Sequence, residues 1–204
     1  MLLAIDTSAG TSVAVVDAGR VLAEASEAGT RRHAEAIGAL LRQALGDAGI
    51  RPADVDGVVA GMGPGPFTGL RVGIAAARAF AFGIGAPVHP VVSHDAIAWG
   101  REERVLVITD ARRREVAWSL YDPNLVRVEG PALADRGEGF DAIVASHPGV
   151  PVLDPLEVSA ASLGLVAEYL LAAGRPLGPD QPLYLRAPDA TIPAPLKQVG
   201  QPRA

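Results

Sequence analysis

Three polar residues follow the first apolar run of the chain and make up its earliest candidate site. Asp6, Thr7 and Ser8 come directly after residues 2–5, where the chain turns toward a second apolar run. An aspartate in such a turn can hold the water shell of a nucleotide-bound metal, provided that a glycine beside it lets a phosphate approach. Ser8 stands where that glycine would lie. The alternative is that Asp6 only caps the turn, so we predict a vestigial phosphate turn.

The most specific stretch of the chain runs from Gly63 to Gly73 and reads GPGPFTGLRVG. It predicts a stiff loop and then a helix that begins near Thr68, and a helix N-terminus after such a loop can hold an anion. It is not a Walker loop, because no Lys-Ser/Thr pair follows its last glycine. Gly69, Gly73 and Ala77 recur at every fourth residue, which lets another backbone come close. That backbone belongs either to a partner helix or to the chain's own sheet.

The histidines and cysteines do not suggest a metal centre. The chain has four histidines and no cysteine. His33 lies in the first turn of the first predicted helix, but position 37 is an isoleucine, so the His-x-x-x-His spacing of a metal-binding helix is not met. The sequence also contains no Gly-x-Ser-x-Gly motif and no thiol nucleophile. We therefore expect no metal site and no catalytic residue in this chain.

One basic cluster stands out, formed by Arg112, Arg113 and Arg114 together with the nearby Arg101 and Arg104. The three consecutive arginines lie in a predicted turn between two strands. They are either a solvated hairpin turn or a contact for RNA or an acidic partner. The formal net charge of the whole chain is -5, whereas proteins that grip nucleic acid alone usually carry a basic surface. We expect contact with RNA to be indirect, through a partner.

The composition is that of a folded protein. Hydrophobic residues make up 49% and charged residues 20% of the 204 residues, close to ordinary globular usage. The first residues have neither the basic region nor the long apolar region of a signal peptide, and we find no apolar run of about 18 residues that could span a bilayer. We expect a cytoplasmic protein that does not contact a membrane.

The first half of the chain predicts a strand-rich start followed by alternating helices and strands. Residues 2–5, 11–16 and 21–25 read as three strands joined by tight turns, an antiparallel meander. A helix follows over residues 31–48, with Thr30 as its N-cap and Gly49 as its stop. A strand at residues 55–62 and a helix at residues 67–83 complete the unit. This order is that of half a domain of the actin-like ATPase (ribonuclease H-like) fold.

The second half repeats this logic in a thinner form. A strand at residues 88–92 and a helix at residues 93–99, where Ser93 is a candidate cap, still belong to the first lobe. The second lobe is predicted to hold strands at residues 105–109, 116–121, 125–128, 140–145 and 150–153 and a helix at residues 160–173, capped by Ser159. Prolines 176, 179, 182, 188, 193 and 195 predict an extended tail. We therefore predict an α/β protein with a first lobe at residues 1–100, a second, reduced lobe at 101–175 and a Pro-rich tail at 176–204.

Several segments together resemble one known family, the bacterial TsaB proteins, also called YeaZ. The segments are Asp6-Thr7-Ser8, the helix start Arg32-His33-x-Glu35, the stretch from Gly63 to Gly73, Asp110-Ala111-Arg112 with Glu115-Val116, and Pro182-Leu183-Tyr184-Leu185-Arg186. The resemblance covers nearly the whole chain in order. Pro66 departs from the family pattern, which more often has serine there. Proline stiffens the loop and removes a hydroxyl and an N–H group, which weakens an anion-site role.

The resemblance implies an actin-like, two-lobed fold and a shortened paralogue of TsaD. TsaD carries a metal and transfers a threonylcarbamoyl group to the adenosine beside the anticodon of certain transfer RNAs. TsaB-like proteins have no known turnover of their own; they pair with TsaD through helices of the first lobe, form homodimers through much the same surface, and are joined by the ATPase TsaE. ATP and metal are then expected on the partner subunits, and this chain needs no cofactor.

The resulting hypothesis is a non-catalytic scaffold subunit that contacts tRNA through its complex. We expect its partner interface to include residues of the two helices of the first lobe: His33, Ile37, Leu40, Leu41, Gly69, Gly73 and Ala77. Two alternatives stay open, an independent actin-fold ATPase or phosphotransferase and a glycoprotease-like hydrolase. Both need catalytic residues or a nucleotide site that the sequence offers at most in part.

Overall fold

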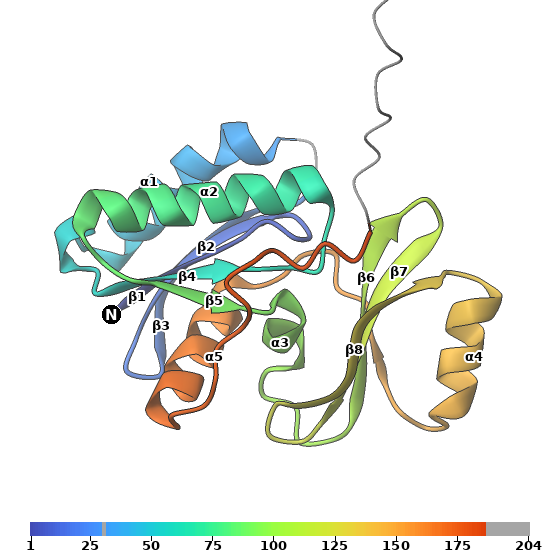
Figure 1. Cartoon of the computed structure of the whole chain (residues 1–204). Coiled ribbons are helices and arrows are strands. Elements are labelled where there is room, and N and C mark those ends of the chain that lie inside the picture. The colour runs from blue at the N-terminus through green and yellow to red at the C-terminus, as the bar shows by residue number, and fades with distance from the viewer. Residues whose placement is uncertain (30–31, 187–204) are drawn as a thin grey trace, which may run out of the picture.

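The computed structural model describes residues 1–29 and 32–186. Two sheets lie side by side, each with helices against it (Figure 1). In chain order the elements are β1 (Leu2–Asp6), β2 (Thr11–Asp17), β3 (Arg20–Glu27), α1 (His33–Ala48), the 3-10 helix η1 (Pro52–Asp54), β4 (Gly57–Gly61), α2 (Phe67–Ile84), β5 (Val88–Val91), α3 (Ser93–Ala98), β6 (Val105–Arg112), β7 (Glu115–Asp122), β8 (Val126–Asp135), α4 (Glu138–Ser146), β9 (Val152–Leu153) and α5 (Ala160–Ala172).

The first sheet has five strands in the order β3-β2-β1-β4-β5. β1, β2 and β3 form the predicted antiparallel meander, and β4 and β5 add to it in parallel. The turn between β2 and β3 is tight because Ala18 and Gly19 both adopt positive φ angles of 49° and 77°, the conformation that suits a two-residue hairpin loop. The predicted order of elements in the first lobe is confirmed.

Both faces of this sheet are covered, which explains why its central strands are apolar throughout. Leu3 and Ile5 of β1 pack under α1 and α2, whereas Leu2 and Ala4 face α5 and the second lobe. Successive side chains of a strand point to opposite faces, so one short strand contributes to both cores. β1 thus lies at the centre of the first lobe, and the residues that follow it are held firmly.

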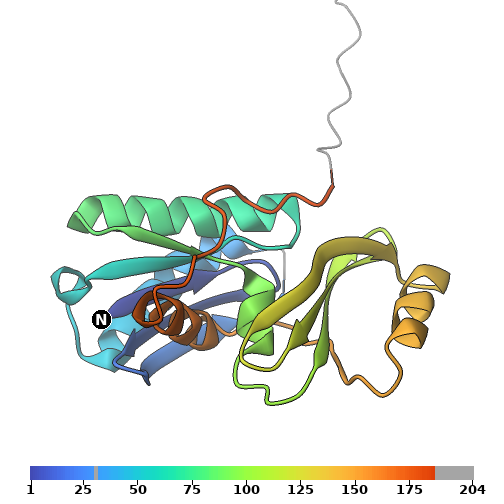
Figure 2. The same ribbon diagram turned by 60° about the horizontal axis from the view of Figure 1, so that its bottom comes forward.

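The second sheet is smaller, with four strands in the order β8-β7-β6-β9. Leu106, Ile108 and Leu120 of this sheet pack against apolar residues of α4 on its outer side. Its inner side faces α3, which lies between the two lobes (Figures 1 and 2). The structure has the actin-like fold with two lobes and a reduced second lobe, as predicted.

The chain returns to the first lobe after β9. α5 packs on β1 and β2 rather than on the second sheet, and Gly164 allows this because a Cβ atom there would lie 2.7 Å from Cγ2 of Val16. Residues 160–172 were expected to belong to the second lobe, whereas they form the lower layer of the first. The predicted boundary near residue 100 therefore separates the two sheets, but α5, which follows it in the chain, belongs to the first lobe.

Several predicted elements need correction. Residues 140–145 were predicted as a strand but lie in α4, because Phe140, Ile143 and Val144 are spaced to bury one helical face against the second sheet. Ser93 was predicted as a helix cap, but it is the first residue of α3, after the N-cap Val92. Thr30 lies outside the described residues, and α1 begins at His33. Ser159 does cap α5, by accepting a hydrogen bond from Ser162 N.

α2 also corrects the expectation about apolar runs. It is long and apolar enough, by length and composition alone, to cross a membrane, with a mean hydropathy of 1.3 over 18 residues. Core helices commonly meet the same criterion, and the inner face of α2 packs on the first sheet. Its high hydropathy also reflects small and apolar residues on its outer face, such as Ala75, Ala79 and Phe82.

Candidate functional site

The turn after β1 is closed around Asp6. Its carboxylate accepts hydrogen bonds at Oδ1 from Ser8 N (2.8 Å) and Ser8 Oγ (2.5 Å), and at Oδ2 from Ser93 Oγ (2.6 Å). A Cβ atom at Gly61 on the neighbouring strand would overlap Asp6, so the strand approaches the carboxylate without a gap. Both carboxylate oxygens are thus occupied by the chain itself, and Ser93 completes the enclosure from α3.

Burial of Asp6 determines its electrostatics. The side chain is 1% exposed, and this desolvation raises the pKa of its carboxyl group, although the hydrogen bonds from Ser8 and Ser93 oppose the rise. A carboxylate that orders water around a metal-bound nucleotide must face solvent. Asp6 instead joins β1 to α3 and acts as a structural link.

Thr7 connects the same turn to α2. Its hydroxyl donates to the carbonyl oxygen of Gly69 (2.8 Å) and accepts from the amide of Gly73 (3.1 Å). These two backbone groups are ordinary i and i+4 partners in an α-helix, so the hydroxyl inserts into the hydrogen-bond ladder of α2. A Cβ atom at either glycine would collide with Thr7. Gly69 and Gly73 therefore face the turn that follows β1, and Ala77 lies in the core beneath the helix. The stripe packs within the chain's own first lobe and not against a partner helix.

His33 belongs to the same buried layer. Its Nδ1 lies 2.7 Å from Oγ1 of Thr11 on β2, and its ring also contacts the backbone at Gly69, where it would meet an added Cβ atom. Burial lowers the pKa of His33, nearby Arg112 lowers it further, and Asp6 acts in the opposite direction. His33 fixes the first turn of α1 on the sheet.

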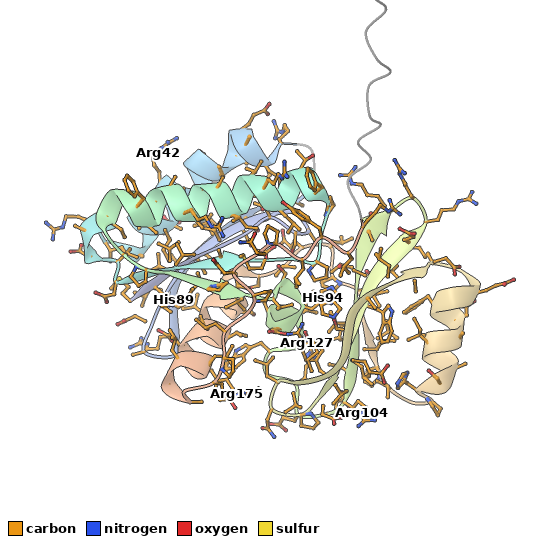
Figure 3. The ribbon with its side chains drawn as sticks, in the orientation of Figure 1. Arg42, His89, His94, Arg104, Arg127 and Arg175 are labelled. Atoms are coloured by element: carbon orange, nitrogen blue, oxygen red, sulfur yellow. The ribbon has the colours of Figure 1, made fainter. Side chains whose placement is uncertain are left out.

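The predicted interface residues lie on the inner sides of α1 and α2. Ile37, Leu40 and Ala77 are buried in the core beneath these helices, and Leu41 is partly exposed. The two helices lie side by side. Their outer face is formed by other exposed residues, which include Glu35, Ala39, Arg42 and Gly46 of α1 and Ala75, Arg78, Ala79, Phe82 and Gly83 of α2. Figure 3 shows Arg42 pointing away from the sheet on this face.

The basic cluster is divided in the structure. Arg112, Arg113 and Arg114 form the exposed tip of the β6–β7 hairpin, whereas Arg104 precedes the other end of β6 (Figure 3). Arg104 donates to Asp122 Oδ1 over 2.5 Å. The five arginines predicted as one cluster are therefore two groups, because Arg101 and Arg104 lie before β6 and the three others lie at its far end.

Among residues 1–29 and 32–186, no set of three or more His, Asp or Glu side chains is close enough together to hold a metal ion.

Comparisons with known proteins agree on one family. The model of the family of TsaD, tRNA N6-adenosine threonylcarbamoyltransferase, matches residues 20–158. The chain belongs to this family. A Haemophilus influenzae tRNA threonylcarbamoyladenosine biosynthesis protein, TsaB, is 36% identical over 145 residues, which cover 68% of this chain and 58% of that protein. An uncharacterized Mycobacterium tuberculosis protein is 42% identical over 179 residues, 83% of this chain and 82% of that protein.

A solved structure extends the match to the fold. A Pseudomonas aeruginosa protein described as similar to the peptidase YeaZ superposes with a TM-score of 0.74 at 28% identity, covering 91% of this chain and 99% of that one. The resemblance to the TsaB, or YeaZ, proteins is thereby confirmed.

Sequence reasoning missed the polar seam that joins the two lobes of this TsaB-like chain. His94 of α3 is fully buried, with Nδ1 2.8 Å from Ser119 Oγ and Nε2 2.9 Å from Thr109 Oγ1 on the second sheet. Burial, together with the charge of Arg127 nearby, lowers the pKa of His94 to about 3 (Figure 3). In the sequence, the seam is visible only as three polar residues, His94, Thr109 and Ser119, that stand beside apolar residues.

The neighbouring residue continues the seam. Asp95 Oδ1 accepts a hydrogen bond from the hydroxyl of Tyr121 (2.6 Å) and lies 3.7 Å from Nε of Arg127. Burial raises the pKa of Asp95, whereas Arg127 lowers it; burial and the charge of Asp95 raise the pKa of Tyr121. α3 therefore fixes the position of the lobes relative to each other.

The segment 176–186 forms an extended strap that runs along the first lobe and ends on the second (Figure 1). This agrees with the predicted extended tail for the part of the tail that the structure describes. Leu183 N donates to Met62 O (2.8 Å). Tyr184 stacks on Phe67 with ring centroids 4.7 Å apart, and Arg71 lies over the same Phe67 ring at 3.8 Å. Arg186 forms an ion pair with Glu115 of the second lobe. The strap thus covers the Gly/Pro loop before α2.

Proposed function

We propose that this chain is a non-catalytic subunit of the machinery that makes threonylcarbamoyladenosine in transfer RNA. It pairs with a TsaD-like threonylcarbamoyltransferase, which performs the chemistry in the cytoplasm, and a TsaE-like ATPase joins the assembly. ATP and metal are bound by those partners. The family membership and the relatives named above support a role in threonylcarbamoyladenosine synthesis. The geometry of the Asp6 turn supports a non-catalytic chain whose partners perform the chemistry.

The observation that carries this proposal is the enclosure of Asp6. In an actin-like ATPase, the turn after the first strand must leave room for phosphates and for hydrated metal. In this chain the amide and hydroxyl of Ser8 and the hydroxyl of Ser93 take the carboxylate's oxygens, and the strap covers the neighbouring Gly/Pro loop. The turn binds α2 and α3 of the chain itself instead of receiving a substrate.

The outer face of α1 and α2 is the surface that we propose for the partner. Small residues Ala75, Ala79 and Gly83 recur at every fourth position on the exposed side of α2, which lets a facing helix approach closely. Phe82 is 90% exposed beside them, an unusual position for a large apolar side chain. A homodimer would use the same face twice about a two-fold axis, and a partner of the same fold would replace one copy.

ATP hydrolysis by the isolated chain tests the proposal. We expect the purified protein to release phosphate no faster than a buffer control, with the Asp6→Asn variant indistinguishable from it. Asparagine keeps the size of the side chain and can still pair with Ser8 and Ser93. Steady hydrolysis that is lost in the Asp6→Asn variant would contradict the proposal and favour an independent ATPase or phosphotransferase.

A further inference from the structure

The tip of the β6–β7 hairpin is built in an unusual way. Arg112, Arg113 and Arg114 have φ angles of 64°, 53° and 62°, a left-handed conformation that costs an L-residue about 1–2 kcal/mol. Tight hairpin turns of this kind ordinarily contain Asn-Gly or Asp-Gly. This chain has three consecutive arginines there, so long basic side chains stand at positions whose backbone conformation is strained.

A bulge adds to this construction. The pairing of β6 with β7 shifts between Asp110 and Arg112, and Arg112 pairs with Glu115. Bulges next to functional sites commonly re-aim a side chain, and residues held in left-handed conformations commonly mark such sites. The positive φ angles of Arg113 and Arg114 are those of an ordinary two-residue hairpin loop. The departures from regular geometry at this exposed basic tip are the positive φ angle of Arg112 and the bulge beside it.

The acidic residues that flank the tip are engaged by other groups. Asp110 lies 3.7 Å from Arg136, and Glu115 pairs with Arg186 of the strap. Asp135, opposite Glu115 on β8, accepts hydrogen bonds from the amides of Gly137 and Gly139 at the start of α4. Arg136, which also pairs with Asp154, and Arg186 thus offset the acidic residues at the base of the hairpin.

The position of the tip relates it to the proposed partner surface. The hairpin rises on the side of the molecule where the N-terminal end of α2 lies (Figures 1 and 2). Arg112 is close enough to the first turn of α1 to influence His33 electrostatically. A partner docked on the α1–α2 face would therefore have the hairpin tip beside it.

We infer that the β6–β7 tip, residues 112–114, is a contact for RNA phosphate groups in the assembled complex. Guanidinium groups suit phosphates because they offer several donors in a planar fork. The inference rests on the proposed function, since it requires the partner to present the RNA. An acidic protein surface is the competing occupant, and the experiment below distinguishes it.

The test uses the complex of this chain with its TsaD-like partner and measures tRNA affinity by fluorescence anisotropy at several salt concentrations. The variant carries Arg113→Asn and Arg114→Gly, which suit the left-handed turn and so should leave the melting temperature unchanged or raised. We expect tRNA affinity to fall at least about tenfold. The slope of log affinity against log salt should become shallower by about one to two.

The control complex carries Arg101→Gln and Arg104→Gln, which remove the same charge at the far end of β6, and should retain the affinity. An unchanged affinity and salt slope in the hairpin variant would overturn the inference alone. A variant that binds the partner more weakly, but whose complex has an unchanged tRNA affinity once it is assembled with excess partner, would also overturn it, and would identify an acidic protein contact. If the unvaried chain did not join the partner at all, the proposed function would fail, and this inference with it.

Discussion

The insertion of the Thr7 hydroxyl into α2 explains two glycines at once. Gly69 and Gly73 supply the carbonyl and the amide that Thr7 contacts, and a side chain at either position would displace Thr7. The glycines are therefore required by a residue more than 60 positions earlier in the chain. Their cost in helix propensity, about 1 kcal/mol each relative to alanine, is offset by a turn that docks closely on the helix.

Gly73→Ala should destabilise the monomer. The new Cβ atom overlaps Thr7 Oγ1, and overpacking of this kind costs about 1–3 kcal/mol. The free energy of unfolding is measured by denaturant titration in dilute, monomeric samples. Gly83→Ala is the matched control, because nothing lies within 4 Å of its added Cβ atom and alanine improves helix propensity. Equal stability of the two variants would show that Thr7 does not need the close approach.

His94 should make stability depend on pH. Its pKa is lowered to about 3 in the folded chain, against about 6.5 when unfolded. As pH falls from 6.5 toward 3, the unfolded chain gains a proton that the folded chain does not, so the free energy of unfolding decreases. The decrease attributable to this residue is up to about 1.4 kcal/mol per pH unit.

The variant His94→Gln isolates this contribution, because His33 and His89 also have lowered pKa values and act with the same sign. Unfolding free energies of both proteins are measured between pH 7 and pH 5. The slope of the variant should be smaller. Parallel slopes would mean that folding does not lower the pKa of His94 and that the buried seam is incorrectly assigned.

At the scale of elements, the outer face of α2 should determine association. Ala79→Trp places a large side chain on the exposed stripe and should leave the melting temperature of the monomer unchanged. It should weaken the homodimer and the complex with the TsaD-like partner by about one to two decades, since a bulky residue separates closely packed helices. Sedimentation velocity measures both associations.

Ala145→Trp serves as its control, because Ala145 is an exposed alanine of α4 on the far side of the second lobe. It should leave both associations unchanged. If Ala79→Trp also left them unchanged in a folded protein, the interface would have to lie elsewhere.

The strap should loosen when its aromatic contact is removed. Tyr184→Ala loses the stacking on Phe67 and the hydrogen bond from Arg71 Nε (3.0 Å). The amide of Leu183, which donates to Met62, should then exchange with solvent faster, as hydrogen-exchange mass spectrometry can show. Tyr184→Phe keeps the ring and should change exchange much less. Equal protection in the alanine variant would indicate that backbone contacts alone hold the strap.

Local patterns predicted the elements whose contacts are local. The three-strand meander, α1, α2, α5 and the Gly/Pro loop follow from turn residues and from helical or alternating spacing. α4 was mistaken for a strand because Phe140, Ile143 and Val144 form a short apolar run in which the two periods are hard to tell apart. The sequence did not show which side of α2 faces the core, because that side is fixed by contacts with Thr7, which lies more than 60 residues earlier in the chain.

The candidate site shows the same division. Asp6, Thr7, Ser8 and His33 were found from their types and positions, but their roles depend on partners elsewhere. Ser93, which encloses Asp6, and Ser119, which holds His94, are 87 and 25 residues away from those partners. Spacing along the chain carries no record of such contacts, so the enclosure of Asp6 could only be seen in the fold.

The whole molecule behaves as two lobes joined at several points. α3 links them through His94 and Asp95, and the strap links them through Arg186. Arg175 adds a link on the opposite side by donating to the carbonyls of Asn124 and Leu125 in the β7–β8 turn (Figure 3). These contacts favour a rigid body that presents surfaces, which suits a scaffold better than an enzyme that must close around its substrate.

Reconstituted tRNA modification tests the central claim most directly. The TsaD-like and TsaE-like partners are supplied with threonylcarbamoyl donor, ATP and tRNA, and threonylcarbamoyladenosine is measured with no chain, the unvaried chain or its Asp6→Asn variant. We predict little product without the chain and equal, much greater product with either form. Product that does not depend on the chain, or that is lost with a folded Asp6→Asn variant still bound to its partner, would contradict the account of a non-catalytic subunit.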